Sequence, residues 1–228
     1  MANLCFTQYR FHGSQADLSH FRDKLVEWTK WDETGNWDCR TLTNVLECAG
    51  LQDRVLTSES PSAEEPEHED KLMCKGVVSH IEDFATAEGS REYVEIYTET
   101  AWIPMPEMWQ AVIAKLGIDI KFAYLATEDC NSVHTLYDPE GYGDFDTCEY
   151  YLDFDIVDES AELRNRFSSC KINEEAGGYY LTTNVITEWL QALLQTNESD
   201  IAKLSEQARD YPFSNDTSYV IVSKVLRK

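Results

Sequence analysis

Basic residues are scarce in this chain. Its 228 residues include 19 Lys and Arg against 42 Asp and Glu, which gives a formal net charge of −23 at pH 7. Contacts to phosphates need clustered Lys and Arg, so this charge argues against direct binding of a nucleic-acid backbone or an anionic membrane. Apolar runs are also short, because none approaches the roughly 20 residues that span a bilayer.

The sequence motifs that mark common enzyme and cofactor sites are missing as well. The seven cysteines form no Cys-x-x-Cys pair, and there is no P-loop, no dinucleotide fingerprint and no Gly-x-Ser-x-Gly elbow. The five histidines show no His-x-x-x-His or His-Glu-x-x-His spacing. We therefore assign no catalytic residue and no resident cofactor, and we expect a protein that binds rather than catalyses.

The first ten residues lack the basic and apolar regions of a signal peptide. An odd number of cysteines without a disulfide-type spacing pattern favours reduced thiols. Together these features predict a cytoplasmic protein.

The apolar content, 43% hydrophobic and 12% aromatic, is enough to build a core. Alternating apolar residues indicate strands, and apolar residues at three- and four-residue spacing indicate helices. Ser14 is a suitable N-cap and Gly117 a suitable helix end. The predicted strands are 4–11, 76–84, 91–100, 118–126, 133–137, 149–157 and 219–226, and the predicted helices are 15–30, 41–49, 106–116, 159–169, 183–195 and 201–208.

This order predicts a mixed α+β protein built on an antiparallel sheet. Residues 1–56 are expected to form a β-α-α segment that packs on the main sheet, and residues 57–71 an acidic loop. We expect residues 72–158 to form the α+β core. Residues 159–228 are expected to be a mostly helical extension that returns a final strand to the sheet.

Two short stretches resemble the Api92-like proteins of phages, plasmids and other mobile elements. They are Met1-Ala2-Asn3-Leu4-Cys5 with Phe11-His12-Gly13, and Glu99-Thr100-Ala101-Trp102-Ile103-Pro104 leading into a helix with Trp109. The Gly-rich segment usual in that family is replaced by 138–143. The resemblance implies a ferredoxin-like sheet and a mobile-element context, and it carries over no catalytic residue.

The acidity is concentrated in two segments. Residues 122–163 contain twelve Asp and Glu and no Lys or Arg, and residues 57–70 contain six acidic residues and again no basic one. At strand spacing, Glu149, Tyr151, Asp153 and Asp155 are expected to share one face, with carboxylates roughly 7 Å apart, similar to phosphates along one nucleic-acid strand. This pattern predicts a surface that engages a basic protein, such as a host nucleic-acid-binding or defence protein, by charge or by nucleic-acid mimicry. A surface that only keeps the protein soluble is the simpler interpretation.

Exposed aromatic residues often anchor interfaces, and two tryptophans flank the turn at 32–36. Burial of these tryptophans under a loop is the competing interpretation. The residues expected to contact the partner are Asp138, Glu140, Asp144, Asp146, Glu149, Asp153, Asp155, Asp158, Trp31 and Trp37.

The alternative is a cation site, and with it a metal-dependent enzyme. Residues 138–149, counted as a twelve-residue calcium loop, have acidic residues at positions 1, 3, 7, 9 and 12 and glycine at position 6. Position 5 is Tyr142, which offers no carboxylate. The predicted divalent-cation ligands are Asp138, Glu140, Asp144 and Glu149, and an acidic hairpin loop without a metal is the competing interpretation.

Overall fold

The computed structural model divides the chain into two compact units. Unit 1 comprises Met1–Asn131 and Tyr137–Asp144, and unit 2 comprises Ser132–Leu136 and Phe145–Lys228. The structure describes residues 4–30, 37–55, 71–82, 85–86, 92–128, 133–143, 145, 148–155, 172–173, 178–210 and 219–228.

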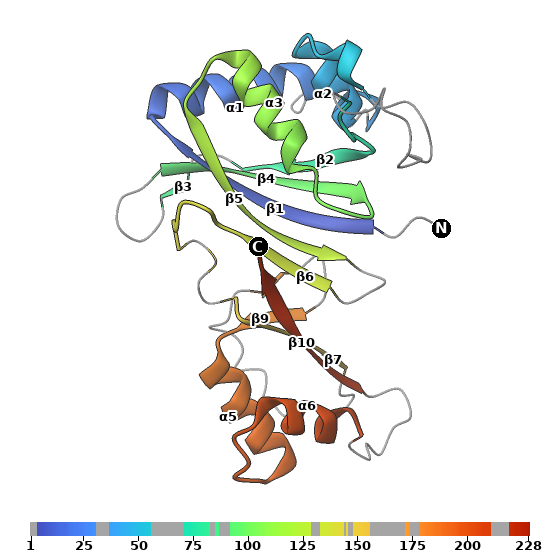
Figure 1. Ribbon diagram of the computed structural model, residues 1–228, viewed down its shortest axis with the longest axis vertical. Coiled ribbons are helices and arrows are strands. Elements are labelled where there is room, and N and C mark those ends of the chain that lie inside the picture. Colours follow the sequence, from blue (N-terminus) through green and yellow to red (C-terminus); the bar gives the residue numbers. More distant parts are fainter. Residues whose placement is uncertain are drawn as a thin grey trace. The chain divides into compact units, whose positions relative to one another are not determined.

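Unit 1 is a sheet with helices on one face (Figure 1). Its strands run in the order β2-β4-β1-β5, every neighbouring pair is antiparallel, and the short β3 pairs with β4. The elements are β1 (Leu4–Gly13), α1 (Gln15–Thr29), η1 (Trp37–Arg40), α2 (Leu42–Cys48), η2 (Gln52–Arg54), β2 (Gly76–Ile81), β3 (Ala85–Thr86), β4 (Glu92–Ala101), α3 (Pro106–Leu116) and β5 (Ile120–Glu128).

Local sequence signals set the helix ends of unit 1. The Ser14 side chain accepts a hydrogen bond from the Asp17 backbone N–H at 3.2 Å and so caps α1. Pro106 stands at the first position of α3, where its missing N–H costs nothing. Gly117 ends this helix with φ 67°, a left-handed conformation that glycine adopts without strain.

The core of unit 1 lies between the sheet and the helices, and aromatic rings dominate it. Trp109 of α3 makes edge-on contacts with Tyr9 and Phe11 of β1, with ring centroids 5.9 and 5.6 Å apart. The Tyr9 hydroxyl accepts a hydrogen bond from the Met105 backbone N–H at 3.1 Å. This bond fixes the start of α3 over β1, so that packing and one buried hydrogen bond together position the helix.

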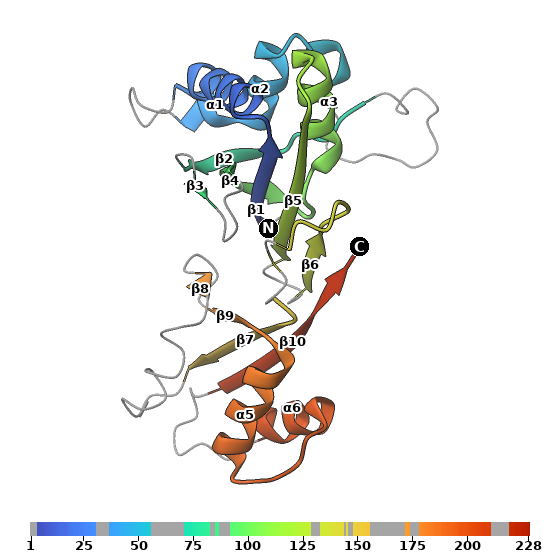
Figure 2. The ribbon, with the colours of Figure 1, turned by 90° about the vertical axis from the view of Figure 1, so that its left-hand side faces the viewer.

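Unit 2 also has strands with two helices on one face (Figure 2). Its strand order is β6-β10-β7-β9-β8, in which β10 runs parallel to β6 and the other described pairs are antiparallel. The elements are β6 (Val133–Tyr137, whose last residue belongs to unit 1), β7 (Tyr150–Asp155), β8 (Ile172–Asn173), β9 (Gly178–Leu181), α5 (Thr183–Leu194), α6 (Ile201–Arg209) and β10 (Tyr219–Arg227).

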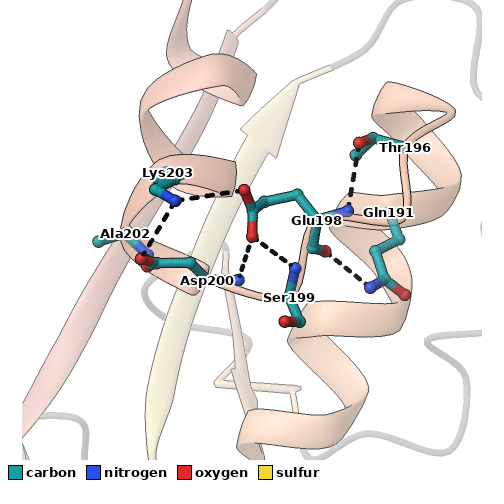
Figure 3. A network of polar contacts seen from close by, with 7 residues as sticks. All are labelled: Gln191, Thr196, Glu198, Ser199, Asp200, Ala202 and Lys203. Carbon is teal, nitrogen blue, oxygen red and sulfur yellow. Dashed lines mark hydrogen bonds and ion pairs between the residues drawn. The ribbon is translucent and has the colours of Figure 1, made fainter.

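The helices of unit 2 pack on Leu152 and Val220 of the sheet through Trp189 and Leu204, all of which are buried. A polar network joins α5 to α6 (Figure 3). The Glu198 carboxylate accepts hydrogen bonds from the backbone N–H groups of Ser199 and Asp200, at 2.9 and 3.0 Å. These two hydrogen bonds lower the pKa of Glu198 because they favour the charged carboxylate at the start of α6. The bond from the Asp200 N–H has the larger effect.

The structure confirms the mixed α+β class. Its division of the chain differs from the expected one, because β1 lies inside the sheet of unit 1 and β7 belongs to unit 2. The predicted loop at 57–70 and helix at 159–169 lie outside the described residues. Among the described residues, no helix is both long and apolar enough to span a bilayer.

Candidate functional site

Asp138, the first residue of the predicted cation loop, uses its carboxylate to hold its own turn. Its two oxygens accept hydrogen bonds from the backbone N–H groups of Tyr142 and Gly143, both at 2.9 Å. The turn lays the Tyr142 ring on His12 of β1, with ring centroids 4.0 Å apart and planes 27° apart. Asp138 therefore fixes the 138–143 turn within unit 1.

Glu149 caps a helix. Thr182, the N-cap residue of α5, makes no side-chain cap bond, and the Glu149 carboxylate accepts from the Thr183 hydroxyl and, at 2.8 Å, from the Thr183 backbone N–H. Both hydrogen bonds lower the pKa of Glu149, and the bond from the Thr183 hydroxyl has the larger effect. The positive end of the α5 dipole also favours the charged form of Glu149. A residue predicted to contact a partner or a metal therefore holds α5 to the start of β7.

The strand that follows has a buried tyrosine on the face predicted to be acidic. Tyr151, between Glu149 and Asp153, is buried, and its ring stacks on His134 of β6 with centroids 3.9 Å apart. Asp153 is half-buried opposite Ile221 of β10. On the face predicted to carry the charges, the described side chains are thus Glu149 as a helix cap, a buried Tyr151 and a half-buried Asp153.

The remaining predicted residues divide into three groups. Glu140 is exposed in the turn that Asp138 holds. Trp37 lies in η1 and Asp155 at the end of β7, where the structure does not describe their side chains. Trp31, Asp144, Asp146 and Asp158 lie outside the described residues.

Of the four predicted cation ligands, Asp138 and Glu149 accept the hydrogen bonds given above, Glu140 is exposed, and Asp144 lies outside the described residues. Over the described residues, no cluster of three or more His, Cys, Asp or Glu side chains has a geometry that holds a metal ion.

A pocket of about 430 Å³ lies in unit 1 between the end of α3, the start of β5 and residues 137–140. We call it the α3–β5 pocket. Its apolar lining includes Ile113, Ala114, Ile118, Phe122, Tyr137 and Pro139. The volume falls within the range of ordinary ligand pockets, roughly 300–1,000 Å³, which are also mainly apolar.

Few polar side chains line the same pocket. They are Asp119 just before β5, Lys121 in β5, Glu140 in the 138–143 turn and Gln110 on α3. Asp119, Lys121 and Glu140 are exposed and make no ion pair with any other residue that the structure describes. The two carboxylates leave the pocket with a net negative charge.

Comparison of the chain with models of protein families, with curated proteins and with solved structures finds no match. The candidate site must therefore be judged on its own geometry.

Sequence reasoning missed two buried polar clusters on the helix-free faces of the sheets. In unit 1, the Arg10 guanidinium pairs with Glu95 at 2.5 Å, and the Tyr97 hydroxyl donates to the same carboxylate at 2.6 Å. In unit 2, His134 Nδ1 and the Tyr180 hydroxyl are 3.0 Å apart, and burial lowers the pKa of His134 to about 4. Both clusters assemble residues that are far apart in the sequence, so no local motif announces them.

Proposed function

We propose that this protein is a non-enzymatic acidic binding protein that engages a basic surface of another protein. The observation that carries the proposal is the excess of exposed carboxylates that form no ion pair within the described part of the chain. Seven exposed acidic residues make no ion pair with another described residue: Glu47, Asp53, Glu107, Asp119, Glu140, Glu188 and Glu206. Such a surface attracts basic partners over several ångströms and speeds their association.

The proposal does not depend on a regular, phosphate-like row of charges, since Asp138 and Glu149 have structural tasks and Tyr151 is buried. It rests on net charge and on exposed carboxylates such as Glu140. A host nucleic-acid-binding or defence protein has the basic surface that this chemistry requires.

A ferredoxin-like unit 1, a mobile-element context and a cytoplasmic location belong to the same proposal. The β1-α1-β2-β4-α3-β5 order and the antiparallel pairing of unit 1 support the ferredoxin-like assignment. The short resemblance to the Api92-like proteins supports the context. Cys48 and Cys74 are free thiols, which suits a reducing compartment.

The test is affinity capture from a bacterial lysate on the immobilised full-length chain, at low and at high salt. We expect basic proteins to bind at low salt and to be released as salt screens the exposed charges. A variant with Lys at Glu47, Glu107, Glu140 and Glu188 should lose this capture while keeping its circular dichroism spectrum. Capture that resists both high salt and charge reversal would contradict the proposal.

A further inference from the structure

We propose that the α3–β5 pocket is where the basic partner docks, and that the pocket takes a segment with an apolar side chain flanked by Lys or Arg. This inference rests on the proposed function and gives it a location. The pocket unites an apolar lining with two exposed carboxylates in a chain of net charge −23.

The lining residues Tyr137 and Phe122, which we call the pocket floor, are held in place before any partner binds. The Tyr137 ring stacks on Tyr124 of β5, with centroids 5.1 Å and planes 17° apart, and it also contacts Phe122 at 6.2 Å. The Asp138 turn follows Tyr137 directly and is fixed by its two backbone hydrogen bonds. A floor ordered in advance lowers the entropy lost when a ligand binds.

The rim decides the chemistry of the occupant. Asp119 and Glu140 bring two negative charges to the pocket, against the single positive charge of Lys121. An apolar anchor on the floor removes apolar surface from water, and cationic neighbours of that anchor pair with the two carboxylates. A second copy of this chain is disfavoured, because two molecules that each carry −23 repel one another.

The experiment measures binding of a fluorescent peptide made of Lys-Lys-Leu repeats to the full-length chain at low salt by anisotropy. A peptide with Ser in place of each Leu tests the apolar anchor, and we expect it to bind about tenfold more weakly. Ala114→Trp fills the pocket from the exposed side of α3 and should weaken binding of the Leu peptide by about tenfold or more. Ala114→Ser is the matched control and should leave binding unchanged.

Charge variants separate docking in the pocket from general attraction. Glu140→Lys should weaken binding about five- to tenfold, and Lys121→Glu should strengthen it by a similar factor at low salt. Glu188→Lys makes the same charge change on α5 in unit 2 and should alter binding less than about twofold.

The outcomes distinguish the two proposals. If the wild-type chain binds neither peptide at low salt, the proposed function fails. If it binds both peptides equally, or if Glu188→Lys weakens binding as much as Glu140→Lys, attraction is general, and the pocket assignment is overturned while the proposed function stands. Binding of a neutral Leu peptide as tight as that of the cationic one would assign the pocket to an apolar ligand instead. Dimers detected by analytical ultracentrifugation and removed by Ala114→Trp would assign it to a second copy.

Discussion

Units 1 and 2 both cover one face of a sheet with helices, and they differ in how they fill the opposite face. Unit 1 buries an ion pair there, Arg10 with Glu95, and the Tyr97 hydroxyl shares the carboxylate. Unit 2 buries a neutral group in the corresponding place, with His134 stacked on Tyr151 and hydrogen-bonded to Tyr180. The two polar faces therefore respond to different perturbations.

Unit 1 is sensitive to the loss of a partner, because a buried charge without its counter-charge is costly. Unit 2 is sensitive to the gain of a proton, because burial disfavours the charged form of His134. The helix starts differ in a similar way. In unit 1 the cap of α1 comes from the adjacent Ser14, and in unit 2 the cap of α5 comes from Glu149, which is distant in the sequence.

The largest expected effect is in unit 1. Glu95→Gln replaces the carboxylate that pairs with the Arg10 guanidinium by a neutral amide, and both side chains are only 10% exposed. We expect this variant to lower the free energy of unfolding by about 3 kcal/mol. Urea unfolding followed by circular dichroism measures the change.

The control for this prediction removes both charges. The double variant Arg10→Met with Glu95→Leu keeps the volumes similar, and it should unfold within about 1 kcal/mol of the wild type. If Glu95→Gln instead costs less than about 1 kcal/mol, the pair behaves as a solvated surface pair, and the contrast between the two units is lost.

How much of the molecule the sequence predicts depends on the range of the interaction. Helix α1 with its Ser14 cap, helix α3 with its Gly117 end, and strand β6 are set by local patterns, and the sequence predicts them within a residue or two. The position of β10 between β6 and β7 depends on pairing across the chain, which a period-two pattern does not specify.

The same limit applies to the candidate site. The Asp138-Pro139-Glu140-Gly141 turn is visible in the sequence, and its acidic residues are visible too. The contacts that these side chains make are not visible in the sequence. Glu149 accepts from Thr183, and the Tyr151 ring stacks on His134, only after the sheet forms. The α3–β5 pocket is likewise assembled from three separate segments, and no spacing rule connects Ile113 with Tyr137.

The second expected effect belongs to unit 2 and is driven by pH. The native pKa of His134 is about 4, below its usual 6.5. Between these two pH values the unfolded chain therefore binds a proton at His134 that the native chain does not bind. The contribution of His134 to stability is therefore full above about pH 6.5 and is lost as the pH falls toward 4, by up to about 3 kcal/mol. Urea unfolding at several pH values in this window measures the slope.

His134→Gln removes the titrating ring and should reduce this slope relative to the wild type, even if it lowers stability at neutral pH. Tyr180→Phe keeps the ring of His134 buried and removes only the hydroxyl at 3.0 Å, so it should retain most of the slope. Identical slopes in the wild type and His134→Gln would show that His134 does not carry the difference between the units.

The smallest expected effect compares the two helix caps. Glu149→Ala and Ser14→Ala each remove the acceptor at a helix start, and each should lower the free energy of unfolding by about 1 kcal/mol. Only the Glu149 effect should depend on pH, because the pKa of Glu149 is lowered in the native state. The contribution of Glu149 to stability is present above the unfolded pKa and is lost as the pH falls through the native pKa. The stabilities of Glu149→Ala and the wild type should therefore converge in acid, while Ser14→Ala stays less stable than the wild type.

Glu188→Ala, an exposed change on α5 itself, is the control for urea unfolding. A loss of stability in Glu149→Ala no larger than in this control would show that Glu149 does not cap α5.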